Sequence, residues 1–367
     1  MKIVVLGLRG FPNIQGGVET HCKKLYPLIA AAGHEVIVIA RSPYAGEKPY
    51  EYNGVKILPI SCPRQKFLEA FAHTFFGLFT AKKLNPDILH IHAVGPAIMI
   101  PLARLMGFKV VLTHHGPDYE RKKWNKFAKF ILKTGECFGC RAANAVICIA
   151  PNIAADVKRK YGVDATVVPN GVAMPQILGT GEALNKYGLR KGKYLLSVGR
   201  FVPEKGFHDL IEAFSGAGLG NDWKLAIAGD ADHQDAYSRD LKEKAQASAG
   251  VVLTGFLTGA PLAELYENAG LFVLPSYYEG LPIALLEALS YGLSCIVSGI
   301  PANRNVKMED SRFFKPGDIA GLAAKIREFT AFPLSEAARR EQLAMISAEY
   351  AWPKIAAQTL EVYRSLR

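Results

Sequence analysis

Two glutamates, Glu279 and Glu287, stand eight residues apart in the segment SYYEGLPIALLEALS, around the start of an otherwise apolar helix. Pro282 is typical of a first helical turn, and a helix that opens there turns Glu287 toward the side that packs inward. Glu279 precedes this helix, where unpaired backbone N–H groups and the helix dipole favour an anion. This pair of carboxylates suits a ligand with phosphates and vicinal hydroxyls, and a nucleotide sugar fits that description.

Two cations follow another expected strand, in the segment SVGRFVPEKGF. Arg200 and Lys205 can neutralise a diphosphate there, and an arginine can bind it through two parallel hydrogen bonds. Stabilising a departing nucleoside diphosphate in this way is an electrostatic route to catalysis. The structural alternatives are a solvated loop for the cations, a helix cap for Glu279, and a salt-bridged or solvent-reaching side chain for Glu287.

Paired glycines, Gly16 and Gly17, lie on the loop after the first expected strand, directly before Val18-Glu-Thr20. Glycines at a helix start let the backbone approach a phosphate or a sugar closely, although a tight turn also explains them. The dinucleotide fingerprint GxGxxG is absent, because Gly7 is followed by Leu and Arg. The sequence therefore argues against a nicotinamide or flavin site.

Strand and helix patterns alternate along the chain in two series, which predicts α/β architecture with two doubly wound, Rossmann-like parallel-sheet domains. Expected strands of the first series cover residues 3–6, 36–39, 88–91, 109–112, 145–149 and 166–168, and its helices cover 18–31, 95–106, 122–142 and 153–161. Those of the second series cover residues 194–198, 225–228, 251–253, 271–274 and 295–297, with helices over 207–214, 235–249, 260–269 and 283–291. Ligands of such folds bind at the carboxyl ends of the strands.

A turn signal at Pro169-Asn170-Gly171 places the boundary between a first domain of residues 1–170 and a second domain of residues 171–352. Beyond Glu336 the pattern predicts two helices with a break near Trp352-Pro353. The last of them, at about residues 353–367, is expected to pack back on the first domain.

The composition indicates a globular protein of two domains, with 367 residues of which half are hydrophobic. No apolar run reaches the roughly 18 residues of a membrane-spanning helix, and MKIVVLG leads directly into a strand, so we expect no membrane span and no signal peptide. The six cysteines show no disulfide framework, and the single CxxC is no zinc site. These features predict a reduced, cytoplasmic protein.

The formal net charge of +11 is uneven, with +12 in residues 1–170 and −1 in residues 171–367. Such a field favours an anionic partner for the first half: acidic lipid, a diphosphate-linked acceptor or nucleic acid. No nucleic-acid-binding motif accompanies the charge, so we expect no nucleic acid. Asp230-Ala-Asp232 has the spacing of a metal-binding DxD, but it ends an expected strand where a Gly-Asp turn is routine, and we expect no metal there.

Taken together, the motifs resemble family 4 of the retaining glycosyltransferases, which have the two-domain GT-B fold. The resemblance covers essentially the whole chain. The segments that carry it are Gly16-Gly17, GRFVPEKG at 199–206, AGD at 228–230, TGF at 254–256 and PSYYEGLPIALLEALSYG at 275–292. The segments GLRGFPNIQGGVET and HHGPDYERKKW are most similar to bacterial enzymes of surface-polysaccharide assembly, including proteins assigned as rhamnosyltransferases.

The resemblance implies a role for each site residue, with the first domain on the acceptor side and the second holding the nucleotide sugar. Arg200 and Lys205 would bind the donor diphosphate, Glu287 both ribose hydroxyls, and Glu279 the hydroxyls of the transferred sugar. The other implied donor contacts are the amides near Gly280 and Leu281, the base-bordering Phe256, and Gly16 and Gly17 closing from the first domain. Pro282 has no N–H, so a family contact through that amide is ruled out.

The family also has a histidine after a first-domain strand, in a Thr-x-His pattern that Thr113-His114-His115 matches. His115 is in register and would hydrogen-bond the reacting sugar, with His114 as the competing candidate. Satisfying local polar groups is the structural alternative for both histidines. His90 and His92 alternate in DILHIH and so share one face of a strand, where core packing is the expected role.

The resemblance implies a metal-independent, retaining transfer from a nucleoside-diphosphate sugar, with a UDP-sugar favoured, to a glycan or lipid-linked acceptor, and no further cofactor. The acceptor hydroxyl would be deprotonated by the departing phosphate. Three other functions remain open from the sequence: an NAD-dependent oxidoreductase, a nucleotide-sugar epimerase of the same architecture, and a non-catalytic binding protein.

Two segments of the first half suggest that the protein contacts the anionic inner face of the cell membrane. Residues 67–79 are rich in phenylalanine, and residues 121–129 combine cations with Trp124 and Phe127. The structural alternatives are a buried helix and a solvated basic helix. Charge reversal at Lys122, Lys123 and Lys126 should abolish vesicle binding if the contact exists.

Overall fold

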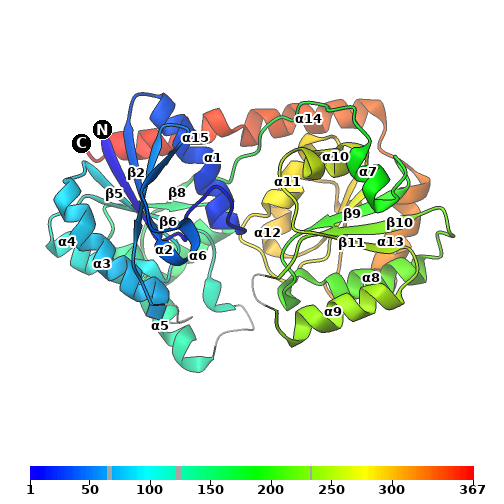
Figure 1. Cartoon of the computed structure of the whole chain (residues 1–367), viewed down its shortest axis with the longest axis horizontal. Helices are drawn as coiled ribbons and strands as arrows, with labels where there is room; N and C mark the ends of the chain where they lie inside the picture. Colours follow the sequence, from blue (N-terminus) through cyan, green and yellow to red (C-terminus); the bar gives the residue numbers. More distant parts are fainter. Residues whose placement is uncertain (64–67, 121–124, 232–233) are drawn as a thin grey trace. The chain divides into compact units, whose positions relative to one another are not determined.

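The computed structural model describes residues 1–63, 68–120, 125–231 and 234–367 (Figure 1). Its internal contacts divide the chain into two compact units. Unit 1 comprises residues 1–171 and 352–367, and unit 2 comprises residues 172–351. Each unit is an α/β structure built on a mainly parallel sheet, which confirms the expected fold class.

The sheet of unit 1 has eight strands within the described residues, in the order β3-β4-β2-β1-β5-β6-β7-β8. They are β1 Lys2–Leu6, β2 Glu35–Arg41, β3 Tyr50–Tyr52, β4 Val55–Ile60, β5 Ile88–His92, β6 Val110–His114, β7 Ala145–Cys148 and β8 Thr166–Val167. The sequence patterns did not indicate the antiparallel β3–β4 hairpin. Asn53 and Gly54 form its turn with φ values of 47° and 79°, and two positive φ angles match the twist of a tight hairpin.

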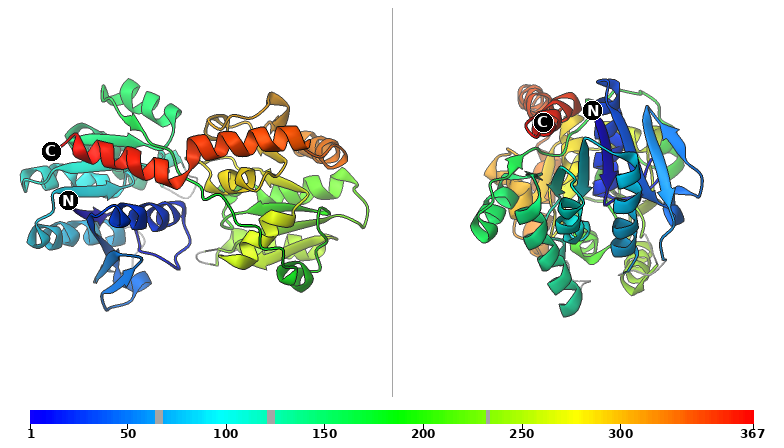
Figure 2. Two further views of the ribbon diagram at one scale, coloured as in Figure 1. Left: turned by 90° about the horizontal axis from the view of Figure 1, so that it is seen from above. Right: turned by 90° about the vertical axis from the view of Figure 1, so that its left-hand side faces the viewer.

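The helices of unit 1 cover both faces of this sheet. They are α1 Gly17–Ala31, α2 Ser42–Ala45, α3 Leu68–Leu84, η1 Pro96–Met99, α4 Ile100–Leu105, η2 Asp118–Glu120, α5 Lys126–Ala142, α6 Pro151–Tyr161 and α15 Trp352–Arg364. The chain winds from β1 toward β4 in one direction and from β5 toward β8 in the other. Right-handed crossovers therefore place α1 on one face and α3, α4 and α5 on the opposite face. The helix α15 runs beside α1 (Figure 2).

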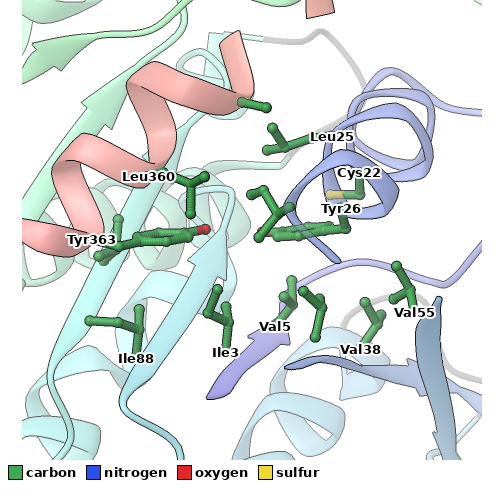
Figure 3. Packing of buried hydrophobic residues seen from close by; sticks show 14 of the residues in the cluster. Ile3, Val5, Cys22, Leu25, Tyr26, Val38, Val55, Ile88, Leu360 and Tyr363 are labelled. Atoms are coloured by element: carbon green, nitrogen blue, oxygen red, sulfur yellow. The ribbon is translucent and has the colours of Figure 1, made fainter. Parts of the chain in front are cut away.

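The core on the α1 face joins the two ends of the chain. Tyr26 of α1 and Tyr363 of α15 lie over the strands with Leu25, Leu360 and Ile3, all of them buried (Figure 3). Burying an aliphatic or aromatic side chain of this size contributes roughly 1.5–3 kcal/mol each. The last helix is thus part of the core of unit 1.

The sheet of unit 2 is wholly parallel in its described residues, in the order β11-β10-β9-β12-β13-β14. Its strands are β9 Tyr194–Val198, β10 Lys224–Ala228, β11 Val251–Gly255, β12 Leu271–Leu274, β13 Cys295–Ser298 and β14 Phe313–Phe314. Its helices are α7 Glu182–Tyr187, η3 Pro203–Lys205, α8 Phe207–Ala217, α9 Ala236–Ala247, α10 Ala260–Asn268, α11 Ile283–Ser290, α12 Pro301–Arg304, η4 Asp310–Arg312, α13 Ile319–Ala331 and α14 Glu336–Tyr350. The two helices expected after Glu336 are confirmed as α14 and α15.

Three of the sequence predictions fall partly on residues that are not described. Arg121, Lys122, Lys123 and Trp124 lie outside the described residues, as do Phe67 and Asp232. In the part of the chain that is described, no helix combines the length and the apolar character that crossing a bilayer requires.

Candidate functional site

The charged residues expected to act in unit 2 gather at the carboxyl ends of β9 and β12. These strands are neighbours in the sheet, and the chain winds away from them in opposite directions. In doubly wound folds, ligands bind beyond the carboxyl ends of the strands at such a switch point. Arg200 and Lys205 follow β9 and Glu279 follows β12, so the topology joins side chains that are 74 positions apart in the sequence.

Glycines let the motif loops of unit 2 pack against one another. A Cβ on Gly206, whose φ is +67°, would overlap the carbonyl oxygen of Pro275, and one on Gly229 would overlap the carbonyl oxygen of Gly199. The Gly229 N–H also donates to the carbonyl of Gly255 at 2.9 Å. Only glycine allows such close backbone contacts at positive φ. The GRFVPEKG, AGD, TGF and PSYYEG segments therefore form one contiguous group of loops.

An ion pair lies at the centre of this group. The Lys205 Nζ donates to Glu279 Oε1 at 2.6 Å, and the side chains are only 18% and 11% exposed. Ser276 Oγ donates to the same carboxylate oxygen at 2.6 Å. Water screens such a pair less than a surface pair. The pair is therefore held more strongly than an ion pair on the surface.

Glu287 lies on the first turns of α11, one side of which is buried by Leu285, Leu286 and Leu289. The Tyr266 hydroxyl of α10 donates to Glu287 Oε2 at 3.0 Å. Burial and this carboxylate raise the pKa of Tyr266 well above its usual value, so the phenol keeps its proton as a donor. Glu287 itself is half-buried, so the expected inward-facing carboxylate is only partly confirmed: the leucines take the inner side of α11, and Glu287 contacts the buried Tyr266.

The remaining residues expected in unit 2 surround these groups. Arg200 and Gly280 are half-buried, Leu281 is buried, and Phe256 is half-exposed directly after β11. Pro282 is the residue that precedes α11, with φ −75° and ψ 105°. The N–H groups of the first turn of a helix have no partner within it, so this end of α11 suits an anion.

The aspartate of the candidate DxD motif has a structural partner. Asp230 pairs with Lys242 at 2.8 Å and accepts the Ala231 N–H at 2.8 Å. Within the described ranges, no group of three or more histidine, cysteine, aspartate or glutamate side chains is arranged to hold a metal ion.

In unit 1, the glycine pair lies at the start of α1, beside a buried ion pair. Arg9 donates from its backbone N–H and from Nε to Glu19 Oε1, at 3.2 Å and 3.0 Å. Gly16 has a φ of +155°, and a Cβ there would overlap the Glu19 carboxylate, whereas Gly17 faces open space in the described structure. The pair thus fixes the loop, and the backbone at Gly17 is accessible to a ligand.

The two adjacent histidines after β6 have different surroundings. His114 is buried, its Nε2 lies 2.8 Å from Glu136 Oε1, and its Nδ1 accepts the Gly116 N–H at 3.1 Å. Tyr161 also donates to Glu136. Burial raises the pKa of Glu136, but the hydrogen bonds from His114 and Tyr161 outweigh it and hold that pKa below its usual value. His114 thus satisfies local polar groups, which leaves His115 as the candidate for contact with a ligand.

His115, which is itself only partly buried, is the last member of a hydrogen-bonded chain of otherwise buried rings. Its Nε2 lies 2.9 Å from His92 Nδ1, and His92 Nε2 lies 2.5 Å from the Tyr26 hydroxyl. That hydroxyl is 2.9 Å from His90 Nδ1, which is 2.6 Å from the hydroxyl of Tyr363. His90 and His92 therefore pack in the core, as expected, but they also connect α1 and α15 to His115.

These histidines are held neutral. Burial lowers the pKa of His21 to about 4 and that of His90 to about 3. Burial, reinforced by the neighbouring histidines, lowers the pKa of His92 and of His115 well below the usual value. At neutral pH these rings therefore offer hydrogen bonds rather than charge.

The tautomer of His90 sets the direction of the chain. In the tautomer of His90 that donates from Nε2 to Thr113 Oγ1 at 2.7 Å, Nδ1 accepts only one hydrogen bond, and the Tyr363 hydroxyl is closer to it than that of Tyr26. We therefore infer that Tyr26 donates to His92 Nε2 and that His92 Nδ1 donates to His115 Nε2. In this arrangement the proton of His115 resides on Nδ1, which can serve as a hydrogen-bond donor.

Several site residues were not identified from the sequence. The resemblance covered motif positions, whereas Tyr266, Tyr26, Tyr363 and Arg9 lie outside the family motifs or had no assigned role. Glu19 had the clearest signal, as a carboxylate three residues after Gly16 on the same helix turn.

Comparisons with known proteins agree across both units. A family model described as "Glycosyl transferases group 1" matches residues 181–344, and one described as "Glycosyltransferase Family 4" matches residues 15–174. Glycogen synthase of Mycobacterium tuberculosis is 26% identical and aligns over 99% of this chain and 94% of its own. A UDP-Gal:alpha-D-GlcNAc-diphosphoundecaprenol alpha-1,3-galactosyltransferase of Escherichia coli is 30% identical over 60% of each chain.

Solved structures show the same fold. Sucrose-phosphate synthase from Thermosynechococcus elongatus superposes with a TM-score of 0.85 at 22% identity, covering 100% of this chain and 98% of its own. An Anabaena protein solved in complex with UDP-glucose superposes with a TM-score of 0.79 at 16% identity over the full length of both chains.

Proposed function

Because the chain belongs to the GT-B glycosyltransferases of family 4, we propose that its donor is a nucleoside-diphosphate sugar, with a UDP-sugar favoured. We further propose that the acceptor is a glycan or a lipid-linked glycan of bacterial polysaccharide assembly. The E. coli relative, whose name includes UDP-Gal and a diphosphoundecaprenol acceptor, supports both proposals. The relatives named above are glycosyltransferases, which does not favour an epimerase or an NAD-dependent oxidoreductase.

The observation that carries the proposal is the Lys205–Glu279 ion pair at the switch point of unit 2, with Glu287 on the adjacent helix. A diphosphate carries the charge that Lys205 and Arg200 would neutralise. When Lys205 turns to the phosphate, Glu279 loses its cation and becomes an acceptor for hydroxyls of the sugar. Glu287, oriented by Tyr266, would accept the two ribose hydroxyls.

The proposed reaction retains the anomeric configuration. The bond between the anomeric carbon and the β-phosphate oxygen breaks, and the acceptor oxygen bonds to the same face of that carbon. The acceptor proton passes to the departing phosphate oxygen, so no enzymic base is required. Arg200, Lys205 and the first turn of α11 would stabilise the leaving group without a metal ion, and Glu279 would support the positive charge on the sugar.

In unit 1, His115 would donate from Nδ1 to a hydroxyl of the transferred sugar, and the backbone at Gly16 and Gly17 would approach the donor. A neutral donor suits this role, because a hydroxyl is recognised by hydrogen bonding and needs no counter-charge.

The test is a thermal-shift panel with UDP, GDP, dTDP, CMP and NAD on the unmodified protein, on Glu287→Ala and on the control Glu243→Gln. Glu243 is an exposed carboxylate on α9. A ligand that binds only the folded state at about 100 times its Kd adds about 2.7 kcal/mol to the free energy of unfolding. We expect one nucleoside diphosphate to raise Tm in the unmodified protein and the control, and to lose most of its effect in Glu287→Ala.

The panel also identifies failures. No response to any diphosphate, or a response to NAD alone, would contradict the proposed donor. If the active diphosphate sugar were isomerised without an acceptor, the protein would be an epimerase instead. Transfer with the anomeric configuration of the product read by NMR then tests retention.

A further inference from the structure

Phenylalanines cover the outward side of α3. Phe71, Phe76 and Phe79 are each about half-exposed, and Gly77, on the opposite side, packs so closely that a Cβ would meet Leu6 of β1 at 2.5 Å. A helix that packs on a core needs one apolar side, whereas α3 is apolar on both. The outward phenylalanines are therefore not explained by the folding of unit 1.

The same pattern recurs on α5. Phe127 is 72% exposed, Phe130 is 67% exposed and Phe138 is 51% exposed. They follow helical spacing along one side of α5. The other side of α5 packs against the rest of unit 1 at Gly135 and Gly139. A Cβ on Gly135 would overlap the carbonyl oxygen of Val94, and one on Gly139 would overlap the side chain of Ala97.

The two helices cover the same face of the sheet. Right-handed crossovers place both on the side opposite α1, and η1 packs against each of them. Both helices lie on this side of unit 1 (Figures 1 and 2). Six exposed aromatic rings thus point away from one layer of one unit, which is more than scattered surface apolar residues require.

Lysines accompany these rings, and acidic groups do not. Lys83 of α3 and Lys126 and Lys133 of α5 are exposed. The acidic side chains of the two helices are Glu69 and Glu136, and both are buried in bonds to Arg41 and His114. The outward side of α3 and α5 therefore combines aromatic rings with exposed lysines, and neither helix adds an exposed acidic side chain of its own.

We propose that this aromatic and basic face, formed by the exposed phenylalanines and lysines of α3 and α5, binds the surface of an anionic phospholipid bilayer. Rings of this kind enter the boundary between headgroups and acyl chains, and lysines beside them attract acidic headgroups. A second copy of the chain suits the face less well, because its lysines would meet like charges. The proposal goes beyond sugar transfer and holds for any lipid-linked acceptor.

The experiment is co-sedimentation of the full chain with vesicles, in the absence of nucleotide. One set of vesicles is phosphatidylcholine alone, and the other also contains about 30% of the anionic lipid phosphatidylglycerol. We expect binding to the anionic vesicles that falls at high salt. Phe127→Ser with Phe130→Ser, and separately Lys126→Glu with Lys133→Glu, should each weaken binding at least about tenfold.

Matched controls come from unit 2. The double variant Phe332→Ser with Ile177→Ser removes two apolar side chains that are 73% and 65% exposed. The double variant Lys186→Glu with Lys191→Glu reverses the charge of two exposed lysines. Both should bind vesicles as the unmodified protein does. Circular dichroism and the nucleotide thermal shift, measured on all variants, separate loss of this face from misfolding and from failure of the donor proposal.

Three results would overturn the proposal. The first is equal binding to neutral and anionic vesicles, and the second is a loss in the unit 2 controls as large as in the unit 1 variants. The third is sedimentation-velocity evidence of a dimer that Phe127→Ser with Phe130→Ser dissociates, together with no vesicle binding. That last outcome would assign the face to a second copy of the chain.

Discussion

The two units wind similar sheets and place very different groups beyond the carboxyl ends of their inner strands. Both run their chain in two directions from a central pair of parallel strands, β1 and β5 in unit 1 and β9 and β12 in unit 2. Beyond β9 and β12 lie the Lys205–Glu279 ion pair and Glu287. Beyond β5 and β6 lie rings held neutral by burial, with His115 at the end of a chain of hydrogen bonds.

This difference matches the two parts of a nucleotide sugar. A diphosphate is recognised and released through charge, so the unit that holds it needs cations near a movable anion. A sugar hydroxyl is neutral, so its partner needs a fixed donor in a defined tautomer. A shared topology thus supplies positions, and the residues at those positions decide the chemistry.

Acidification should produce the largest difference between the two units, because it should destabilise unit 1 in particular. Seven of the nine histidines lie in residues 1–171. Burial lowers the pKa of His21 to about 4 and of His90 to about 3, while an unfolded histidine titrates near 6.5. Below about pH 6.5 the unfolded chain therefore binds more protons than the folded protein does. The contribution of these neutral histidines to the free energy of unfolding is fully present above about pH 6.5 and is lost as the pH falls.

At pH 5 each of these two histidines should cost about 2 kcal/mol in the free energy of unfolding, or about 4 kcal/mol together. Urea unfolding at pH 7.5 and pH 5 measures the change. His90→Gln should reduce the pH dependence, and His208→Gln in unit 2 serves as the control. A free energy of unfolding that stays constant between these pH values would show that the unit 1 histidines are not held neutral by burial.

Removing the cation that pairs with Glu279 should lower kcat rather than the free energy of unfolding. Lys205→Ala takes away one of the groups proposed to stabilise the departing diphosphate, and we expect kcat to fall about 10²–10³-fold. Steady-state transfer from the donor identified by thermal shift measures this loss. Lys191→Ala, at an exposed lysine of the same unit, should leave kcat unchanged. A loss below about threefold in Lys205→Ala would remove this residue from the proposed mechanism.

Breaking the hydrogen-bonded chain of unit 1 should have the smallest effect. Tyr26→Phe removes the donor to His92, so His115 should populate both neutral tautomers and kcat should fall roughly threefold to tenfold, the worth of about one hydrogen bond. Long-range proton–nitrogen spectra of 15N-histidine-labelled protein report the tautomer, with His115→Gln for assignment. A His115 proton on Nε2 in the unmodified protein would reverse the inferred direction of the chain.

The parts that could be predicted from the sequence are those encoded locally. Strands such as β9 and β12 are short apolar runs, and Arg200, Lys205 and Glu279 stand in loops directly after them. The hairpin β3–β4 was missed, and the helix α3 was expected only as an alternative for residues 67–79, because a short edge pair and a helix apolar on both sides do not follow the expected periods. The expected burial of Glu287 was only partly correct.

The hydrogen-bonded chain of rings in unit 1 could not be predicted from local sequence patterns. Tyr26, His92 and Tyr363 come from separate elements, and nothing in the residues beside any of them indicates the other two. Their association depends on how α1 and α15 pack over β5, which is a property of the tertiary structure. The same holds for Tyr266 and Glu287, which are 21 positions apart.

The origin of α15 has a consequence for the order of assembly. Residues 352–364 complete the core of unit 1 and supply Tyr363, yet they follow all of unit 2 in the chain. During synthesis the ribosome releases unit 2 before this helix, so unit 1 waits with an open flank over α1 while its neighbour can already fold. The sugar-binding histidine proposed here therefore acquires its full set of supporting contacts only after all of unit 2 has been synthesised.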